Sequence, residues 1–255
     1  MFKHTIFLAV VVGLVFALAP AAQAALIVDT DPLVVALGLA EGQTFRMVFI
    51  TSITTPASST EIGTYNTFVN NVANNVTVAN SIVASYAWTW SCIGSTASVH
   101  AIDNTGTWWT DAAPGYPVYM VSTTPGPARK VANDYKDLWD GTILRWFDNS
   151  QAGVSVGDTT AWSGTNTSGY SAIWYANPPG AGSFALGDTS PMKTKTQKTG
   201  NEWIADAWAT KSANTGSRRI YAMSEPILVI PEPATLALLG LGGLGMLMGR
   251  RRVRG

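Results

Sequence analysis

Ser155, His100 and a group of aspartates are the residues of this chain whose types suit catalysis. Gly153-Val-Ser-Val-Gly157 has the spacing that exposes a nucleophilic serine on a sharp turn between a strand and a helix. Such a serine needs an acid and then a histidine later in the chain, and no histidine follows Ser155. We therefore interpret residues 153–157 as a glycine-rich turn and His100 as a structural histidine.

The aspartates cluster in a short segment, at positions 134, 137 and 140. Glycan hydrolysis needs two carboxylates at a fixed separation, and Asp134 with Asp137 would share one helix face. Because solvated helix charges have the same spacing, we predict no catalytic residue and keep a carboxylate-dependent glycan hydrolase as the alternative. Calcium could draw on the oxygens of Asp134, Asp137, Asp140, Asp148, Asn149 and Asp158, but they do not have EF-hand spacing. No metal or other cofactor is predicted.

Ten tryptophans lie between positions 88 and 208, which is more than the core of one domain readily holds. An exposed aromatic ring can stack on the face of a sugar, because the ring is flat and apolar. Four of the tryptophans lie beside Gly, Thr, Ser or Asn, as loop residues do. These candidate glycan-binding residues are Trp108, Trp109, Trp162 and Trp174. We prefer the interpretation that these tryptophans pack in the core or against loops, and a sugar-binding platform is the alternative.

The carboxyl-terminal segment combines two prolines, an apolar run and a basic end. Pro231, Glu232 and Pro233 precede an apolar run that predicts a transmembrane helix over residues 234–249, roughly 24 Å long against a bilayer core of ~30 Å. The prolines prevent the helix from beginning earlier. The tail, residues 250–255, contains Arg250, Arg251, Arg252 and Arg254, which the positive-inside rule keeps in the cytoplasm.

This segment resembles the PEP-CTERM sorting signal of bacteria, in which an exosortase recognises a Pro-Glu-Pro motif, a hydrophobic helix and an Arg-rich end. The resemblance implies that the chain is exported, anchored briefly in the inner membrane, cut near the motif and passed to the cell surface or extracellular matrix. The sorting residues that it implies are Pro231, Glu232, Pro233, Arg250, Arg251 and Arg252. A tail anchor that is never cut is the alternative.

The amino-terminal segment agrees with export. Lys3 and His4 precede an apolar stretch over residues 5–18, and Ala22-Gln-Ala24 follows as a small-residue cleavage site. We predict that residues 1–24 form a signal peptide and that the mature chain begins at Ala25.

Residues 25–225 are long enough for one extracellular domain, and residues 226–255 form the sorting signal. The domain is rich in Thr, Ser, Asn, Gly and Trp, which is typical of a loop-rich α+β fold. It carries eleven basic and fifteen acidic residues, so nucleic acid is not expected as a partner. Cys92 is the single cysteine, which excludes an intramolecular disulfide, and we predict that it is buried.

Hydrophobic periodicity predicts the main elements of this domain. Alternation predicts a strand over 44–51, and apolar residues three and four apart predict a helix from 62 to 76, with Ser58 and Glu61 as its capping box. Further predictions are strands over 85–93, 116–121 and 219–224, a short helix over 131–139 and long loops between 147 and 200.

A second resemblance covers about residues 42–225. The segments Phe45-Arg-Met-Val-Phe-Ile-Thr-Ser52, Ser95-Thr-Ala-Ser-Val-His-Ala-Ile-Asp-Asn104 and Leu138-Trp-Asp-Gly141 resemble exported domains with C-type lectin-like or endostatin-like folds. The paired cysteines and calcium-sugar motifs of lectins are missing, so only the fold is implied. We expect a noncatalytic surface or matrix protein with an adhesion or glycan-binding role, whose partner is an exopolysaccharide or another surface glycan. A purely structural matrix component is a further alternative.

Overall fold

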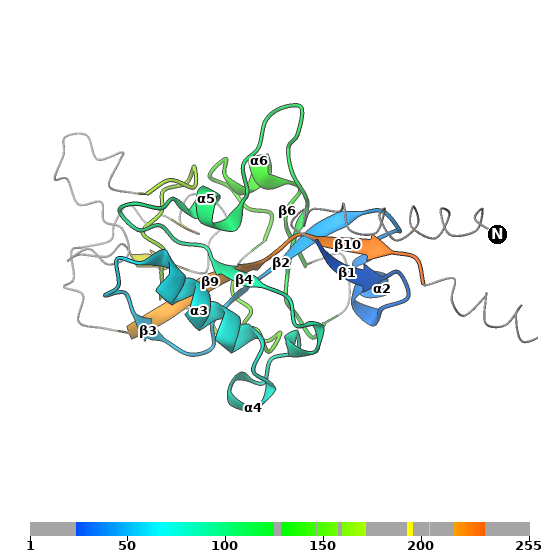
Figure 1. The fold of residues 1–255 in the computed structure, drawn as a ribbon, viewed down its shortest axis with the longest axis horizontal. Coiled ribbons are helices and arrows are strands. Elements are labelled where there is room, and N and C mark those ends of the chain that lie inside the picture. Colours follow the sequence, from blue (N-terminus) through cyan, green and yellow to red (C-terminus); the bar gives the residue numbers. More distant parts are fainter. Residues whose placement is uncertain are drawn as a thin grey trace, which may run out of the picture.

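The computed structural model describes residues 24–124, 129–145, 147–157, 160–171, 193–195, 204 and 217–232. Within these residues, short strands form one connected sheet and short helices lie beside it (Figure 1). The strands are β1 (Ala25–Val28), β2 (Thr44–Ile50), β3 (Thr55–Pro56), β4 (Trp90–Cys92), β5 (Val118–Met120), β6 (Lys130–Ala132), β7 (Thr160–Trp162), β8 (Lys193–Lys195), β9 (Ser217–Ser224) and β10 (Ile227–Ile230). The helices are α2 (Pro32–Leu37), α3 (Ile62–Ala73), α4 (Val76–Ala79), the 3₁₀ helix η1 (Ala84–Tyr86), α5 (Ala101–Thr105) and α6 (Tyr135–Leu138). This mixture agrees with the predicted α+β class.

The central strand is β2, and both of its edges are paired. One edge pairs in parallel with β5, which pairs in turn with β6. The other edge pairs antiparallel with β9 and, further along, with β10. Pro226 lies between β9 and β10, where its missing N–H interrupts the ladder. The two strands therefore line β2 as one interrupted strand.

The sheet continues beyond the predicted domain boundary at residue 225. β10 pairs in parallel with β1, from Ala25 opposite Ile227 to Val28 opposite Ile230, and Val229 lies buried in the core. The folded domain therefore extends to Ile230. β1 begins at Ala25, the predicted first residue of the mature chain, while residues 1–23 of the predicted signal peptide lie outside the described residues.

The predicted strand over 44–51 is confirmed as β2, and both of its faces are buried. Phe45, Met47 and Phe49 pack with α2 and α3 in one hydrophobic cluster. Val48 and Ile50 point to the opposite face and pack with α5 and α6 in a second cluster. The sheet thus separates two cores, which gives the domain helices on both sides of β2.

The predicted helix over 62–76 is confirmed in its first three turns as α3. Its inward face is formed by Tyr65, Val69 and Val72. Val76 instead lies in α4 and is exposed. The predicted capping box was wrong, because Glu61 is the N-cap residue without a side-chain cap bond, and Ser59, not Ser58, accepts a hydrogen bond from the Glu61 N–H.

Two further segments differ from their predictions. Within 85–93 only Trp90–Cys92 forms a strand, because Ala87 adopts a left-handed backbone after η1 and Tyr86 stacks on Trp88. The segment 131–139 divides into β6 and α6, since Ala132 pairs with Val118 of β5 and Asp134 then caps the helix. The predicted strands over 116–121 and 219–224 are confirmed as β5 and β9.

Arg46 connects β2 to the segments around α5 and α6 by hydrogen bonds. The side chain is buried on the same face of β2 as Val48, and its guanidinium donates to Tyr135 Oη at 2.6 Å and Ser224 O at 2.9 Å. It also donates to Gly106 O at 3.3 Å, at the end of α5. These bonds compensate for the burial of the charge and hold α5 and α6 in place relative to β2.

Two partly or fully buried tyrosines predict a loss of stability at high pH. Burial raises the pKa of Tyr65 to about 12, and burial together with the neighbouring Asp31 raises the pKa of Tyr86 to about 12. Both would titrate near 10 in the unfolded chain. As pH rises through 10 to 12, the unfolded chain releases protons that the folded chain retains, so the free energy of unfolding should fall.

Urea unfolding at about pH 9 and about pH 11 measures this effect. The double variant Tyr65→Phe, Tyr86→Phe is the control, and it should lose less stability over the same interval. Equal losses in the control and the natural chain would contradict the assignment to these tyrosines.

Candidate functional site

A small aromatic pocket lies where the loop after α5 meets the loop after β7. It has a volume of about 160 Å³, and we call it the aromatic pocket; its lining residues are Ile102, Trp108, Trp109, Trp139, Ser168 and Tyr170. The backbone carbonyl of Gly106, which accepts a hydrogen bond from Arg46, lies two positions before Trp108 and three before Trp109. The hydrogen bond from Arg46 therefore connects β2 to the loop that carries Trp108 and Trp109.

Trp108 forms the exposed wall of the aromatic pocket. Its side chain is 54% exposed, although its indole Nε1 donates to Asp103 Oδ1 at 2.8 Å. Its ring stands edge-on to Tyr170, with 6.0 Å between ring centroids. The hydrogen bond and the ring contact orient an apolar surface that faces solvent, which is the arrangement required for stacking on a ligand.

Trp139 forms the buried floor of the aromatic pocket. Its Nε1 donates to Thr107 Oγ1 at 2.9 Å. Gly169 packs directly on the indole: a Cβ at this position would lie 3.0 Å from Trp139, and its backbone has φ +82°. The absence of a side chain at Gly169 thus lets the loop over residues 165–171 bring Tyr170 beside Trp108.

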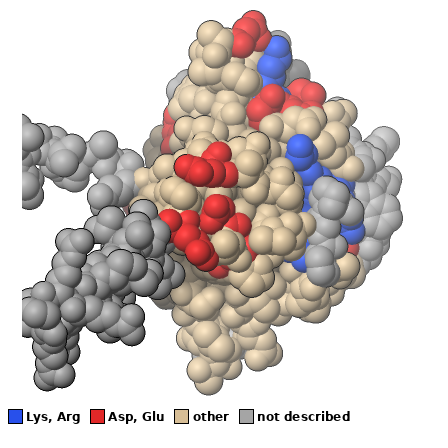
Figure 2. Space-filling view, turned by 90° about the vertical axis from the view of Figure 1, so that its right-hand side faces the viewer, with Lys and Arg blue, Asp and Glu red and all other residues tan. Residues whose placement is uncertain are grey.

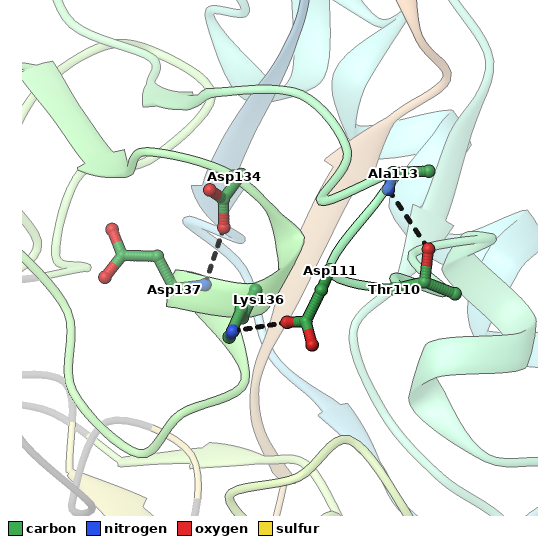
Figure 3. Close-up of polar contacts among 6 residues, drawn as sticks. All are labelled: Thr110, Asp111, Ala113, Asp134, Lys136 and Asp137. Atoms are coloured by element: carbon green, nitrogen blue, oxygen red, sulfur yellow. Dashed lines mark hydrogen bonds and ion pairs between the residues drawn. The ribbon is translucent and has the colours of Figure 1, made fainter.

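The rim of the aromatic pocket carries an ion pair. Lys136 Nζ lies 2.6 Å from Asp111 Oδ1 (Figure 3). The same Nζ lies 5.5 Å from the centroid of the Trp109 ring. The hydrogen bond and the charge of each partner lower the pKa of Asp111 and raise that of Lys136. Both groups are exposed, so the pair orients side chains at the rim more than it stabilises the fold.

The four predicted glycan-binding tryptophans do not form one platform. Trp108 and Trp109 lie together in the aromatic pocket. Trp162 packs inside the domain instead: it lies in β7, is 1% exposed, and donates from Nε1 to Thr55 O at 3.1 Å. Its neighbours Gly, Ser and Thr are polar in sequence, but they belong to a strand and loop covered by the core. Trp174 lies outside the described residues.

Sequence reasoning missed Tyr170 and Trp139. Tyr170 follows Asn-Thr-Ser-Gly169, so it has the same kind of small and polar neighbours as the candidate tryptophans, and this local signal could have identified it. Trp139 follows Leu138 in a segment that predicts a helix, and only the fold shows that it lies beneath residues 108 and 109. Both residues come from loops distant in sequence from Trp108.

The aspartate segment caps its own backbone. Asp134 Oδ1 accepts from the Asp137 N–H at 2.8 Å, and Asp137 Oδ2 accepts from the Asn133 N–H at 2.6 Å. Figure 3 shows the Asp137 carboxylate directed away from that of Asp134. Asp140 Oδ1 likewise accepts from the N–H and hydroxyl of Thr142. These carboxylates therefore cap the start of α6 and a following turn. Asp134 and Asp137 do not face each other across a cleft (Figure 3).

The other residues considered for chemistry have structural contacts. Ser155 pairs with Asn149 across a turn and donates its hydroxyl to Asp148 Oδ2 at 2.8 Å, so residues 153–157 form the predicted turn. His100 Nδ1 accepts from the Ser171 N–H at 3.0 Å. Cys92 is buried, as predicted, and burial raises the pKa of its thiol. Among the described residues, no group of three His, Cys, Asp or Glu side chains could hold a metal ion.

The predicted sorting motif begins directly after the last strand. The Asp29 N–H donates to Ile230 O at 2.9 Å, and Pro231 and Glu232 follow, both exposed. Thr30 Oγ1 donates to Glu232 Oε1 at 2.5 Å. Figure 2 views this end of the molecule, where acidic side chains gather near the middle and basic ones along one edge. Pro233 and Arg250–Arg252 lie outside the described residues.

Comparison with known protein families decides what this segment is. Residues 229–252 match the PEP-CTERM protein-sorting motif. The match supports an exported bacterial protein that is targeted to the surface by an exosortase, as the tail predicts. No curated protein matches the chain. The PEP-CTERM match covers residues 229–252 and gives no role for the folded domain. That role has to be inferred from the geometry of the domain.

In the part of the chain that the structure describes, no helix has the length and apolar character to cross a membrane. The predicted transmembrane helix over 234–249 lies outside that part. Pro231 and Glu232 are exposed immediately after β10, so these two residues of the PEP-CTERM motif are accessible to a processing enzyme.

Proposed function

We propose that this chain is a noncatalytic protein of the cell surface or extracellular matrix that binds a glycan through the aromatic pocket. The observation that carries this proposal is the exposed indole of Trp108, held beside Tyr170 at the mouth of a concave site. The C-type lectin-like resemblance stays a prediction, and glycan binding rests on the aromatic pocket alone.

The size of the aromatic pocket favours a polymeric glycan. Its volume of about 160 Å³ lies below the ~300–1,000 Å³ typical of sites that enclose a drug-sized ligand. One sugar residue of a longer chain fits such a site, with neighbouring residues resting on the surface. Ser168 lines the pocket, and its hydroxyl can bond to a sugar hydroxyl. Asp103, which accepts from the Trp108 indole, is a second oxygen ligand next to this wall.

The contacts of the aspartate segment favour binding over hydrolysis. A glycosidase needs one carboxylic acid and one carboxylate on opposite sides of the scissile bond. Asp134 and Asp137 are instead engaged with backbone N–H groups at the start of α6. The remaining alternative, a purely structural matrix component, predicts that the domain binds no glycan.

Replacing Trp108 by alanine should weaken glycan binding by about 1 to 3 kcal/mol, by analogy with the stacking of a nucleobase on an aromatic side chain. The melting temperature should stay nearly unchanged, because the ring is more than half exposed. Binding of the soluble domain, residues 25–232, to exopolysaccharide and to a glycan array measures the effect.

Tyr116→Ala is the control for this experiment, because Tyr116 is an exposed aromatic residue that does not line the aromatic pocket. This control should bind as the natural domain does. Equal binding by the Trp108 variant would refute the aromatic pocket as the site. Recovery of shortened glycan chains would instead favour the hydrolase.

A further inference from the structure

Two adjoining cavities lie on a different part of the domain and share the wall formed by Ser122, Thr123 and Arg129. One cavity, of about 390 Å³, also contacts Arg145 and the turn over residues 153–155. The other, of about 350 Å³, is lined mainly by apolar side chains of α2, β2 and the η1 region. Neither shares a lining residue with the aromatic pocket.

Arg129 is a buried cation without a compensating partner at its Nε atom. The residue is 6% exposed, and Nε makes no hydrogen bond. Arg129 forms no ion pair with any described residue. A buried charge with an unsatisfied donor is costly, so this arrangement points to a ligand that supplies the missing negative charge.

A second arginine strengthens the positive potential of the polar cavity. Arg145 lines the same cavity, and burial together with the charge of Arg145 lowers the pKa of Arg129. Two guanidinium groups that repel each other are both stabilised by one oxyanion placed between them.

The turn that closes the polar cavity is built to approach this wall closely. A Cβ on Gly153 would lie 2.6 Å from the Thr123 N atom and 2.7 Å from Ile82 Cδ1, so only glycine fits. Asn149 Nδ2 donates to Val121 O at 3.0 Å. Ser122 Oγ accepts a hydrogen bond from the Thr124 N–H, so its hydroxyl proton can still be donated to a ligand. The wall thus offers hydroxyl and guanidinium donors to an anion.

We propose that Arg129 and Arg145 bind the oxyanion head group, carboxylate or phosphate, of an organic ligand whose apolar part occupies the adjoining cavity. Met47, Val83 and Val121 line that cavity, and Arg129 lies at its junction with the polar one. An apolar chain attached to the anion would therefore leave water as the head group binds. The ligand class is a small amphipathic anion.

Isothermal titration of the processed protein tests this proposal with octanoate, octyl phosphate, acetate and inorganic phosphate as probes. At least one of the two octyl anions should bind at least about tenfold more tightly than its short counterpart, because the chain is buried. The better octyl anion identifies the preferred head group. Octanol, which has the chain without the charge, should bind at least about tenfold more weakly than that anion.

Arg145→Gln carries the decisive arm, because Arg145 is exposed and its replacement should leave the fold intact. This variant and Arg129→Gln should each bind the preferred octyl anion at least about tenfold more weakly. Lys130→Gln is the matched control: it removes one positive charge from the next residue, whose Nζ lies over the Tyr119 ring, and should bind within about twofold of the natural protein.

Unchanged affinity of the Arg145 variant would overturn the proposal, as would equal binding of octanol and the octyl anions. Absence of binding by every probe would also overturn it. If Arg129→Gln unfolds, the Arg145 variant still decides the result. Because the aromatic pocket is separate, glycan binding and anion binding can fail independently.

Discussion

Replacing Trp162 by alanine is expected to lower the free energy of unfolding by about 3 to 5 kcal/mol. Trp162 lies in β7 and is 1% exposed. Arg218 Cζ lies over its ring, 5.1 Å from the centroid. Truncation would leave a cavity and remove the hydrogen bond from Nε1 to Thr55 O. Urea unfolding of residues 25–232, followed by circular dichroism, measures the loss.

Trp108→Ala is the matched control for this prediction. It removes the same side chain from an exposed position and should cost less than about 1 kcal/mol of stability. A Trp162 variant as stable as this control would mean that Trp162 is not a core residue, and would return it to the set of candidate glycan-binding residues.

Changing Pro231, Glu232 and Pro233 together to alanine is expected to abolish processing and leave the precursor in the cytoplasmic membrane. The exosortase would lose its recognition motif, whereas the predicted transmembrane helix over 234–249 would keep its sequence. The folded domain should also be retained, since the changes begin after β10. Cell fractionation followed by immunoblotting gives the location and size of the product.

The control changes a second Glu-Pro pair, Glu225 and Pro226, to alanine. These residues lie between β9 and β10, outside the matched motif. This control should be processed and reach the cell surface. A motif variant that is shortened and surface-located to the same extent as the control would show that the Pro-Glu-Pro residues do not direct sorting.

The strongest local patterns in the sequence predicted the right elements. β2 alternates residues of different size on its two faces, and α3 repeats apolar residues at helical spacing. Such patterns arise within one segment, so they are visible without knowledge of the fold. The sorting motif is equally local, which is why its residues were identified from sequence and matched by the family comparison.

Long-range contacts explain what the sequence did not predict. β1 and β10 have four residues each, and they pair across the whole length of the domain. The burial of Arg46 is compensated in part by a hydrogen bond to a carbonyl 178 residues away, and no local pattern signals such a bond. The pairing of β1 with β10, beyond residue 225, could not be predicted for the same reason.

The two candidate sites differ from sequence expectation for the same reason. Neighbouring Gly and Ser residues suggested that Trp162 is in a loop, but parallel pairing of β7 with β9 places it in the core. Arg129 and Arg145 are sixteen positions apart with no motif between them, and only the fold brings them to one cavity.

Mass spectrometry of both ends of the protein recovered from the cell surface tests the central claim, export with exosortase sorting, most directly. We expect a chain that begins at Ala25 and ends at or close to residues 231–233, without the apolar run and the arginines. Recovery of surface protein that still carries Arg250–Arg252 would contradict it.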